Sequence, residues 1–579
     1  MDILEYMRSH LVLLDGGMGS LLISRGLRGG ERPESWNLTH PEVVEEIHRA
    51  YYDAGSNVVL SNTFGANTLH FSREELRSVI PTALRHARAA AASSGGEQEK
   101  FVALDIGPLG KLLAPLGELS FDDAYEIFAE TVRCGAEEAD LIFIETMNDM
   151  AETRAALLAA KENSSLPVFV SNAYSPNGKL LTGAEPAVMV ALLEGMGADA
   201  IGVNCSMEPR ALAAVAEEYL RCATVPVIFK PNAGRPEYVN GQTVYHADPW
   251  SFAEDAAAVV RRGVRCVGGC CGTTPKYVAA LRDKLRGFVS ESPAVARTAC
   301  VTSDRKLLRL GEGPVIVGDR INPTGRADLR EGLAAGELKS VLAEAKKQKR
   351  LGAQVIDVNV SAKGIDQPVT MERAIRELQL TVNLPLQIDT VNTTAMERAL
   401  RAYNGRALVN SVNGREDSMR VLFPLVKKYG GTVVCLTLDE KGLPVTVEER
   451  VAIAERILAA AKQYGLTEAD LIFDPLVLSA RSGPGAAALA LETIRQLKRR
   501  GLLTMAATSN ISFGLPGRGE LEKTFMAMAL EAGVDLLLCN PGVKPGVNEL
   551  ARAALLGGEE EMEIFKVRYT KNDIQKEKL

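Results

Sequence analysis

The sequence predicts an α/β protein made of two consecutive (β/α)8 TIM barrels. Short apolar runs that end in a polar residue recur along the chain, and amphipathic helical segments separate them. Eight such runs fall in each half of the 579 residues. Strand–helix alternation repeated eight times favours a closed parallel barrel over an open sheet. The chain is also too long for one ordinary domain.

The first set of runs predicts a barrel over residues 1–290. The runs read LVLLDGG, NVVLSNTFG, FVALDIGP, LIFIETM, PVFVSNAY, AIGVNCS, PVIFKPNAG and CVGGCCG. Between the first two runs, Val44, Ile47 and Tyr51 have helical spacing, and the segment ends at Gly55 before the next strand. A glycine at that place suits a left-handed helix cap.

The second set predicts a barrel over residues 313–565. Its runs read PVIVGDRIN, QVIDVNV, PLQIDTV, ALVNSVNG, TVVCLTL, LIFDPLV, LTMAATSN and DLLLCNP. The irregular, polar segment 291–312 is expected to be a linker, and the highly charged segment 566–579 a solvated tail or the start of a further module.

Composition excludes several function classes. The net charge is -7, and no run of Lys and Arg resembles a phosphate-binding stripe, so nucleic acid is not an expected partner. No uncharged apolar run approaches the ~20 residues of a membrane span, and the N-terminus lacks the pattern of a signal peptide. The 9 cysteines are too few for a disulfide scaffold. We expect a soluble cytoplasmic protein.

Barrel enzymes place their active sites at the carboxyl ends of the strands, so the residues that end each run are the candidates. In the first half these are Asp15, Asn62, Asp105, Glu145, Asn172, Cys205, Asn232, Cys270 and Cys271. In the second half they are Asp319, Asn322, Asp357, Asn359, Asp389, Asn410, Asp474, Asn510 and Asn540.

Three cysteines among these candidates predict a zinc site. Cys205 ends the sixth run, and the adjacent pair Cys270 and Cys271 ends the eighth. One strand separates the sixth from the eighth in a closed barrel, so their ends meet over the same mouth. Three thiolates can bind one Zn²⁺ at ~2.3 Å per sulfur and leave the fourth tetrahedral position open. Such a site suits the alkylation of a bound substrate thiolate.

The other cysteines are expected to be packing residues, because isolated cysteines usually behave as small apolar side chains. They are Cys134, Cys222, Cys266, Cys300, Cys435 and Cys539. A structural site would need a fourth cysteine close by, and the sequence contains no CxxC pair.

The motifs LLDGGMGS, SNTFGAN, IGVNCS and VGGCCGTTP resemble the homocysteine S-methyltransferase family over about residues 1–290. The resemblance implies that Cys205, Cys270 and Cys271 hold the zinc and that homocysteine sulfur takes the fourth position.

The same resemblance implies how the rest of the substrate is bound. Asp15 and Glu145 would bind the amino group, and backbone N–H groups of the Gly16–Gly17 turn would bind the carboxylate. A second interpretation stays open for Asp15 and Glu145, as caps of strand ends or of helix N-termini.

The second half ends its strands in Asp and Asn, and no histidine follows His246, so histidine general-base chemistry is excluded there. Asp and Asn suit the planar edge of a heterocycle with paired donors and acceptors. Asp474 can accept from a pterin ring N–H and amino group together. Asn510 can hydrogen-bond a ring nitrogen before and after that nitrogen gains a proton.

The motifs GDRINPTGR, DVNV, IDTVN, NSVNG, FDPLV and SNISFGLPGR resemble the pterin-binding barrel of methyltetrahydrofolate–corrinoid methyltransferases, over about residues 314–565. The resemblance implies pterin contacts from Asn322, Asp389, Asn410, Asp474 and Asn510, with Arg518 as a further candidate. Asp319 stands where that family usually shows glutamate, and its shorter side chain puts a direct contact in question. Dihydropteroate synthase shares the barrel, but its TPDSF-like first loop is missing here.

Together the halves resemble the N-terminal half of the cobalamin-dependent methionine synthase family. The resemblance implies that the second barrel activates 5-methyltetrahydrofolate by protonation at N5 so that cob(I)alamin can take the methyl group. Methylcobalamin would then pass it to zinc-bound homocysteine, and methionine and tetrahydrofolate would form. The nucleophilicity of cobalt belongs to the cofactor.

The cobalamin carrier is expected outside this chain. None of the 6 histidines stands in a DxHxxG setting. We expect either a fragment that ends near Leu579 or a subunit that meets a separate corrinoid protein, unable alone to move methyl from folate to homocysteine. Two alternatives stay open: a corrinoid-linked methyltransferase subunit that acts on another thiol, and a binding scaffold whose zinc is structural.

Overall fold

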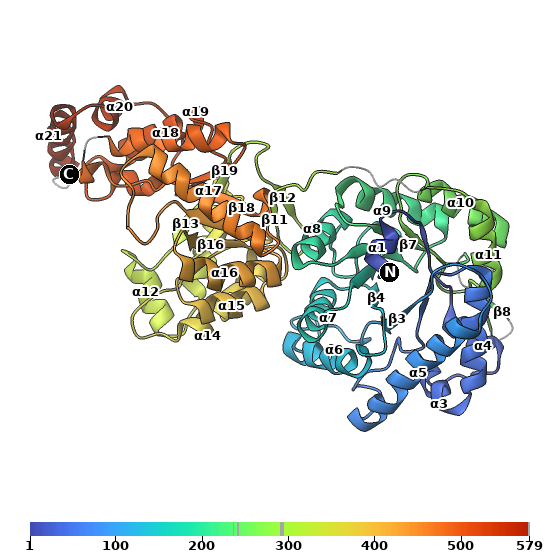
Figure 1. The fold of residues 1–579 in the computed structure, drawn as a ribbon. Helices are drawn as coiled ribbons and strands as arrows, with labels where there is room; N and C mark the ends of the chain where they lie inside the picture. The colour runs from blue at the N-terminus through green and yellow to red at the C-terminus, as the bar shows by residue number, and fades with distance from the viewer. Residues whose placement is uncertain (235–236, 240–241, 290–294, 484, 577–579) are drawn as a thin grey trace. The chain divides into compact units, whose positions relative to one another are not determined.

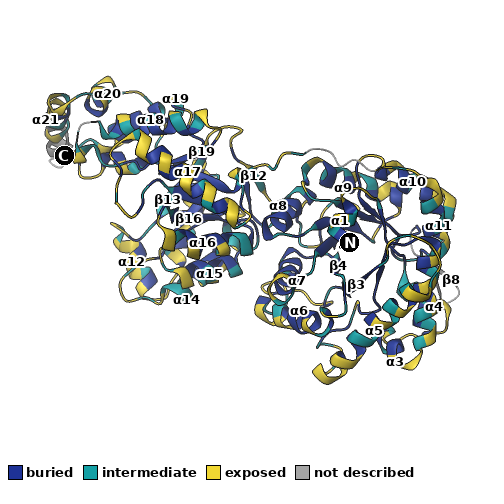
Figure 2. Cartoon of the chain, viewed as in Figure 1, coloured by how far each residue is buried: buried dark blue, intermediate teal, exposed yellow. Residues whose placement is uncertain are grey.

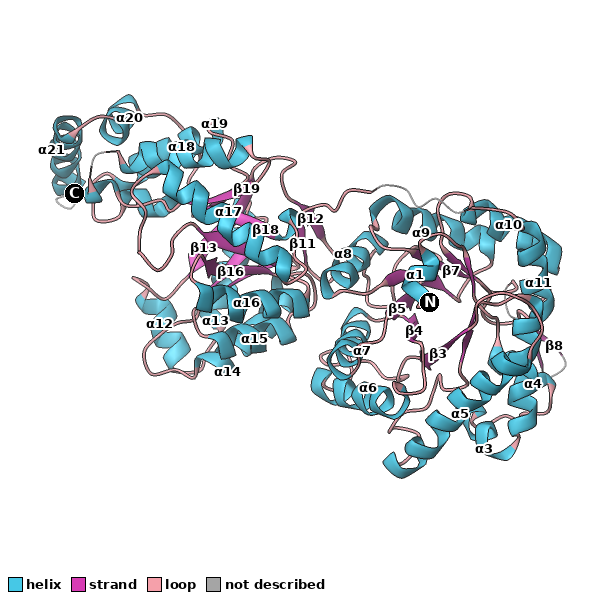
Figure 3. Cartoon of the chain, in the orientation of Figure 1, coloured by secondary structure: helices cyan, strands magenta, loops and turns pink. Residues whose placement is uncertain are grey.

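The structure is a computed structural model that describes residues 1–234, 237–239, 242–289, 295–483 and 485–576 (Figure 1). The chain divides into two compact units, Met1–Arg297 and Thr298–Leu579. In each unit, helices surround a set of parallel strands (Figure 3).

The first unit contains eight parallel strands that form a barrel. They are β1 (Val12–Leu13), β2 (Val58–Leu60), β3 (Phe101–Ile106), β4 (Leu141–Met147), β5 (Val168–Asn172), β6 (Ala200–Asn204), β7 (Val227–Lys230) and β10 (Cys266–Val267). Their order is β1-β10-β7-β6-β5-β4-β3-β2, and a parallel bridge between Leu14 and Val58 joins the two ends of this sheet. Each strand lies in a run that the sequence analysis identified. A short antiparallel hairpin, β8 (Glu237–Val239) and β9 (Gln242–Val244), lies between β7 and β10.

Helices connect these strands. They are α2 (Met18–Ser24), α3 (Trp36–Thr39), α4 (Pro41–Ala54), α5 (Arg73–Ser93), α6 (Phe121–Gly135), α7 (Met150–Asn163), α8 (Pro186–Met196), α9 (Pro209–Cys222), α10 (Pro249–Val260) and α11 (Pro275–Lys284), with α1 (Ile3–Met7) before β1. The helix cap predicted at Gly55 is confirmed, and Gly197 caps another helix in the same way. Gly55 ends α4 with φ 114° and Gly197 ends α8 with φ 86°, a conformation that favours glycine.

Apolar side chains of alternate strand residues fill the interior of the first barrel. Side chains on a strand alternate between its two faces, so the residue two positions along points the same way. Two positions beyond the core residues Ala103, Phe143 and Ile228 stand Asp105, Glu145 and Lys230. The apolar core of the barrel therefore changes to a polar layer at the carboxyl ends of the strands.

The second unit is a closed barrel with the strand order of the sequence. Its strands are β13 (Val315–Ile321), β14 (Val355–Val358), β15 (Leu386–Asp389), β16 (Leu408–Asn413), β17 (Thr432–Leu436), β18 (Leu471–Asp474), β19 (Leu503–Ala507) and β20 (Leu536–Cys539). The prediction of two consecutive (β/α)8 barrels is confirmed. Figure 2 shows the buried strands inside each barrel and the exposed outer faces of the helices.

The helices of the second barrel are α12 (Ala327–Ala334), α13 (Lys339–Leu351), α14 (Gln367–Val382), α15 (Thr393–Ala402), α16 (Glu416–Tyr429), α17 (Val447–Gln463), α18 (Ala486–Arg499), α19 (Arg518–Glu531), α20 (Glu549–Leu556) and α21 (Glu559–Lys576). Short 3₁₀ helices are η1 (Pro33–Ser35) in the first unit, and η2 (Glu468–Asp470), η3 (Ala480–Ser482) and η4 (Thr508–Ser512) in the second. No helix in the described ranges is both long and apolar enough to cross a membrane.

Two segments contain regular structure in their described parts, residues 295–312 and 566–576, that the sequence analysis did not expect. The segment 291–312 contains the antiparallel strands β11 (Cys300–Thr302) and β12 (Leu307–Arg309). Val301 is buried in the core of the second barrel, and the Tyr403 hydroxyl donates to the Thr302 carbonyl at 2.6 Å. The helix α21 extends into the segment 566–579.

Candidate functional site

Three cysteine sulfurs meet at the mouth of the first barrel. The Sγ atoms of Cys205, Cys270 and Cys271 all lie within 4.8 Å of one another, and those of Cys205 and Cys271 are 3.9 Å apart. Sulfurs at ~2.3 Å from a tetrahedral zinc ion would be about 3.8 Å apart. The three side chains can therefore bind one zinc ion.

The backbone at these cysteines takes unusual conformations. Cys205 and Ser206 have φ 60° and 62°, and Gly272 has φ 77°. A Cβ atom on Gly272 would lie 2.2 Å from the ring of Tyr245, so that ring covers the turn after the cysteine pair. Positive φ at two residues other than glycine costs free energy and is typical of functional sites.

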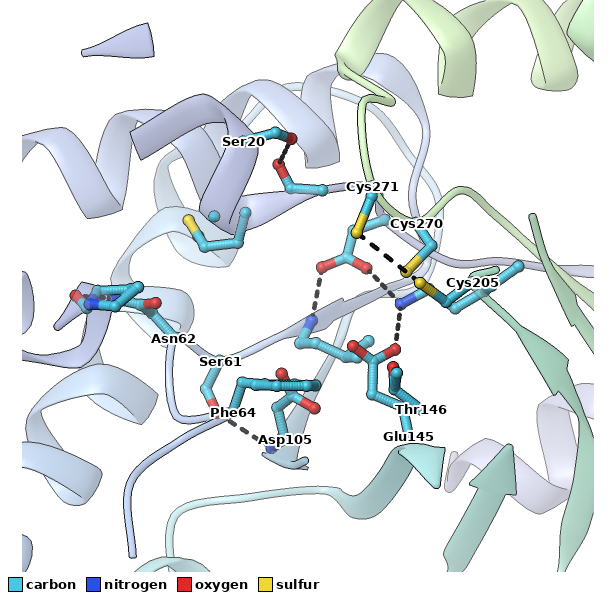
Figure 4. Close-up of a pocket in the computed structure, with 18 of the residues that line it drawn as sticks. Ser20, Ser61, Asn62, Phe64, Asp105, Glu145, Thr146, Cys205, Cys270 and Cys271 are labelled. Atoms are coloured by element: carbon cyan, nitrogen blue, oxygen red, sulfur yellow. Dashed lines mark hydrogen bonds and ion pairs between the residues drawn. The ribbon is translucent and has the colours of Figure 1, made fainter. Parts of the chain in front are cut away.

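The sulfurs lie at one side of a cavity of about 240 Å³ (Figure 4). Its lining includes both acidic and apolar side chains. The lining residues are Asp15, Gly16, Gly17, Met18, Gly19, Ser20, Pro33, Glu34, Leu60, Ser61, Asn62, Phe64, Asp105, Glu145, Thr146, Cys205, Lys230, Cys270 and Cys271. The structure thus brings the expected candidates Asp15, Glu145 and the three cysteines together around one space.

Asp15 and Glu145 are bridged by a lysine that the sequence analysis did not identify. Lys230 Nζ lies 3.4 Å from Asp15 Oδ1 and 3.0 Å from Glu145 Oε2. Burial raises the pKa of Asp15 to about 6, against the lowering effect of Lys230 and of the hydrogen bond from the Leu60 N–H. The strand pattern could have identified Lys230, because it stands two residues after the core residue Ile228 and its side chain therefore points into the barrel.

Asn204 is a second residue that the sequence analysis missed. Its Nδ2 donates to Thr146 Oγ1 at 2.7 Å and to Glu145 Oε2 at 3.4 Å, and contacts Cys270 Sγ at 3.8 Å. Its Oδ1 accepts from the Thr146 N–H at 2.9 Å. Asn204 therefore ties the acidic side of the cavity to the sulfur side.

The Gly16–Gly17 turn lines the same cavity. The Gly17 N–H already donates to the Thr273 carbonyl and to Thr273 Oγ1, both at 3.2 Å. A Cβ atom on Gly17 would lie 2.9 Å from the Cys270 carbonyl oxygen, so this turn packs directly against the cysteine segment.

In the second barrel, several candidate pterin residues lie at strand ends. Asp389 and Asn410 are paired in register on β15 and β16, and Asp474 is the last residue of β18. The Asn359 amide donates to Asp389 Oδ2 at 2.9 Å. Burial raises the pKa of Asp474 to about 6, although its Oδ1 accepts from the Leu476 N–H at 2.7 Å.

The remaining pterin candidates lie in loops or short helices. Asn322 directly follows β13, and its Oδ1 accepts from the Thr324 N–H at 2.9 Å. Asn510 lies in η4 and is exposed. Arg518 begins α19, and its Nε donates to Ser512 Oγ at 3.3 Å. Asp319 is partly buried in β13, and burial raises its pKa.

Comparison with known proteins matches both halves of the chain. Residues 12–285 match the model of the family "Homocysteine S-methyltransferase", and residues 318–540 match that of "Pterin binding enzyme". The chain is 30% identical over 572 residues to methionine synthase from Mycobacterium tuberculosis, with 92% of this chain and 48% of that protein covered. The methionine synthase from Mycobacterium leprae is 30% identical over 577 residues, with 92% and 47% covered.

The two halves of the chain are together similar to part of these methionine synthases. The chain spans about half the length of these methionine synthases. The chain also matches crystal structures of the homocysteine methyltransferase MmuM from Escherichia coli. The oxidized form is 22% identical with a TM-score of 0.41, and the metallated form is 23% identical with a TM-score of 0.40. In both comparisons the match covers 47% of this chain and 96% of the MmuM chain.

Proposed function

We propose that this chain takes part in methyl transfer from 5-methyltetrahydrofolate to homocysteine, with methionine and tetrahydrofolate as products. The first barrel, residues 1–290, would bind zinc and homocysteine, and the second, residues 313–565, would bind the methylfolate. The observation that carries the proposal is the group of three cysteine sulfurs beside a cavity lined by acidic side chains. The two family matches agree with this division of roles.

The sulfur spacing fits zinc. Cys205, Cys270 and Cys271 would hold the ion and leave a fourth position toward the cavity. When bound, Zn²⁺ lowers the pKa of a substrate thiol, and three thiolates around it leave the sulfur electron-rich enough to be alkylated. The proposed site therefore favours attack by a sulfur atom over the activation of water.

The cavity side chains would bind and orient the rest of the substrate. Asp15 and Glu145 are held by Lys230 at fixed positions next to the sulfurs. The apolar side chains of Met18, Leu60 and Phe64 line the same space and would exclude water from the reacting sulfur.

The second barrel would bind the pterin at its strand ends. Asp474 would accept from the ring N–H and the amino group, and Asp389 and Asn410 lie on neighbouring strands to complete the polar edge. Asn510 would contact N5, and its neutral amide can bond that nitrogen before and after protonation. Asn322 and Arg518 would bind at the rim.

Cobalamin does not fit the residues of this chain. The sequence offers no histidine in a DxHxxG setting that would ligate cobalt. We therefore assign cobalamin to another module or to a separate corrinoid protein.

The test follows each half-reaction separately. Zinc-loaded protein should convert homocysteine to methionine when free methylcobalamin is supplied, and should bind 5-methyltetrahydrofolate in the absence of homocysteine. It should form no methionine from methylfolate when corrinoid is left out. Methionine formation without any corrinoid, or no reaction with methylcobalamin, would contradict the proposal.

A further inference from the structure

One carboxylate oxygen at the cavity of the first barrel has no hydrogen-bond partner among the described residues. Asp105 lines the cavity together with Cys205 and Glu145, and only 6% of its surface is exposed. Its Oδ1 has no hydrogen-bond partner within the described part of the chain. Buried polar atoms are almost always hydrogen-bonded, so an unpartnered polar atom at the wall of a cavity indicates that a ligand binds there.

The backbone of Asp105 is fixed by the loop after β2. Its N–H donates to Ser61 Oγ at 3.3 Å, and Thr63 Oγ1 donates to its carbonyl oxygen at 2.8 Å. Asp105 is also two residues beyond the core residue Ala103 on β3, so its side chain continues the inward face of the strand. Figure 4 shows Asp105 and Glu145 at the same cavity.

The other acidic groups of the cavity already have partners. Asp15 and Glu145 share Lys230, and Asp15 Oδ2 also accepts from the Leu60 N–H at 2.8 Å. Glu34 accepts from the Gly65 N–H at 2.6 Å. Four carboxyl groups thus face the cavity with a single lysine, which favours a ligand that carries a positive charge.

We propose that Asp105 binds the ammonium group of the thiol substrate and so selects amino thiols, while Lys230 holds Asp15 and Glu145 in place. This inference rests on the proposed function and deepens it. Under this inference, Asp105 makes a main contact to the substrate ammonium that the sequence analysis assigned to Asp15 and Glu145. An ammonium–carboxylate hydrogen bond away from water is strong, because both partners are charged.

The test compares two thiols that differ only in the amino group, homocysteine and 4-mercaptobutanoate. Calorimetric titration of the zinc-loaded full chain gives a Kd for each. We expect the wild-type protein to bind homocysteine more tightly. The variant Asp105→Asn should weaken homocysteine binding about 10- to 100-fold and change 4-mercaptobutanoate binding less than about threefold. We also expect Asp105→Asn to slow the methylation of homocysteine by free methylcobalamin more than that of 4-mercaptobutanoate, in proportion to the change in the two Kd values.

A matched control is Glu194→Gln, because Glu194 is another buried carboxylate of the first barrel and accepts from the Thr224 N–H outside the cavity. This variant should leave both Kd values unchanged. Zinc content and thermal unfolding show whether each variant is folded. Should Asp105→Asn lose zinc or fold poorly, Asp105→Ser is the second variant, with the same expected loss of preference.

An equal weakening of both thiols by the folded Asp105 variants, or an unchanged preference for homocysteine, would overturn the inference. The failure of the proposed function looks different. In that case the wild-type zinc-loaded protein binds neither thiol, whereas failure of the inference alone leaves tight homocysteine binding in the wild type.

Discussion

Lys230 Nζ lies 3.0 Å from Glu145 Oε2 and 3.4 Å from Asp15 Oδ1, and this bridge is buried at the mouth of the first barrel. Burial opposes the charge on Lys230, but the Glu145 and Asp15 carboxylates outweigh that effect and raise the pKa of the lysine. The lysine thus lets two acidic side chains remain beside the sulfur cluster in the barrel interior.

Replacing Lys230 by methionine should destabilise the first barrel by about 3–5 kcal/mol, because two buried carboxylates lose their cation. Both tryptophans, Trp36 and Trp250, belong to the first barrel. Tryptophan fluorescence during urea unfolding therefore reports this unit alone.

Lys161→Met is the control for that measurement. Lys161 pairs with Asp199 at 3.2 Å, and both side chains are partly exposed, so its loss should cost about 0–1 kcal/mol. Equal stability of the Lys230 and Lys161 variants would show that the bridge contributes no special stability.

Asn204→Ala should weaken the zinc site without removing a zinc ligand. The substitution deletes hydrogen bonds that position Thr146 and Glu145 and a contact to Cys270 Sγ. Loss of such outer contacts typically costs about 10- to 100-fold in metal affinity or activity. Competition with a zinc chelator measures the affinity. Asn163→Ala, at the end of α7, should leave the affinity unchanged, and no change in the Asn204 variant would refute the positioning role.

Binding of 5-methyltetrahydrofolate should weaken as the pH falls through about 6. Burial raises the pKa of Asp474 to that value, so acid protonates the carboxylate and removes the acceptor for the pterin N–H groups. Below the pKa, the affinity should fall about tenfold per pH unit. Calorimetric titrations at several pH values measure it.

Asp474→Asn should bind the folate weakly and lose this pH dependence. Asp417→Asn, at an exposed position in α16, should keep the wild-type profile. A wild-type affinity that stays constant between about pH 5 and pH 7 would contradict the assignment of Asp474 as the acceptor.

The sequence was sufficient to predict the barrels and the meeting of the three cysteines. Eight repeated strand–helix units determine a closed barrel, and the barrel brings the ends of β6 and β10 over one mouth. The same reasoning predicted that Asp15 and Glu145 lie at this mouth, where both line the cavity. Long-range contacts were predictable here because one regular topology fixes where every strand ends.

Functional side chains on the last residue of a strand were harder to predict than those just after it. Lys230 and Asn204 are the last residues of β7 and β6, whereas the residues chosen for these strands, Asn232 and Cys205, follow them. Counting in steps of two from a core residue such as Ile228 finds Lys230. No such count applies to Asn510, because it lies in the short helix η4 beyond the regular strand.

The segment 291–312 differed from the expectation for another reason. Its strands β11 and β12 have three residues each, too few for an alternating pattern to appear in the sequence. Their place becomes visible only through contacts with distant residues, such as the hydrogen bond between Tyr403 and Thr302.

The central claim, that three sulfurs bind a zinc ion with room for a substrate thiol, is tested most directly by zinc-edge X-ray absorption on the reduced protein. Two variants accompany it. Cys205→Ser should lower the zinc content of the purified protein, because it removes a ligand. Cys134→Ser, in α6 and far along the chain from the cluster, should leave it unchanged.

We predict one zinc ion per chain with three sulfur ligands, and four sulfur ligands after homocysteine is added. Reduced protein without stoichiometric zinc, or a sulfur count that homocysteine does not change, would contradict the account.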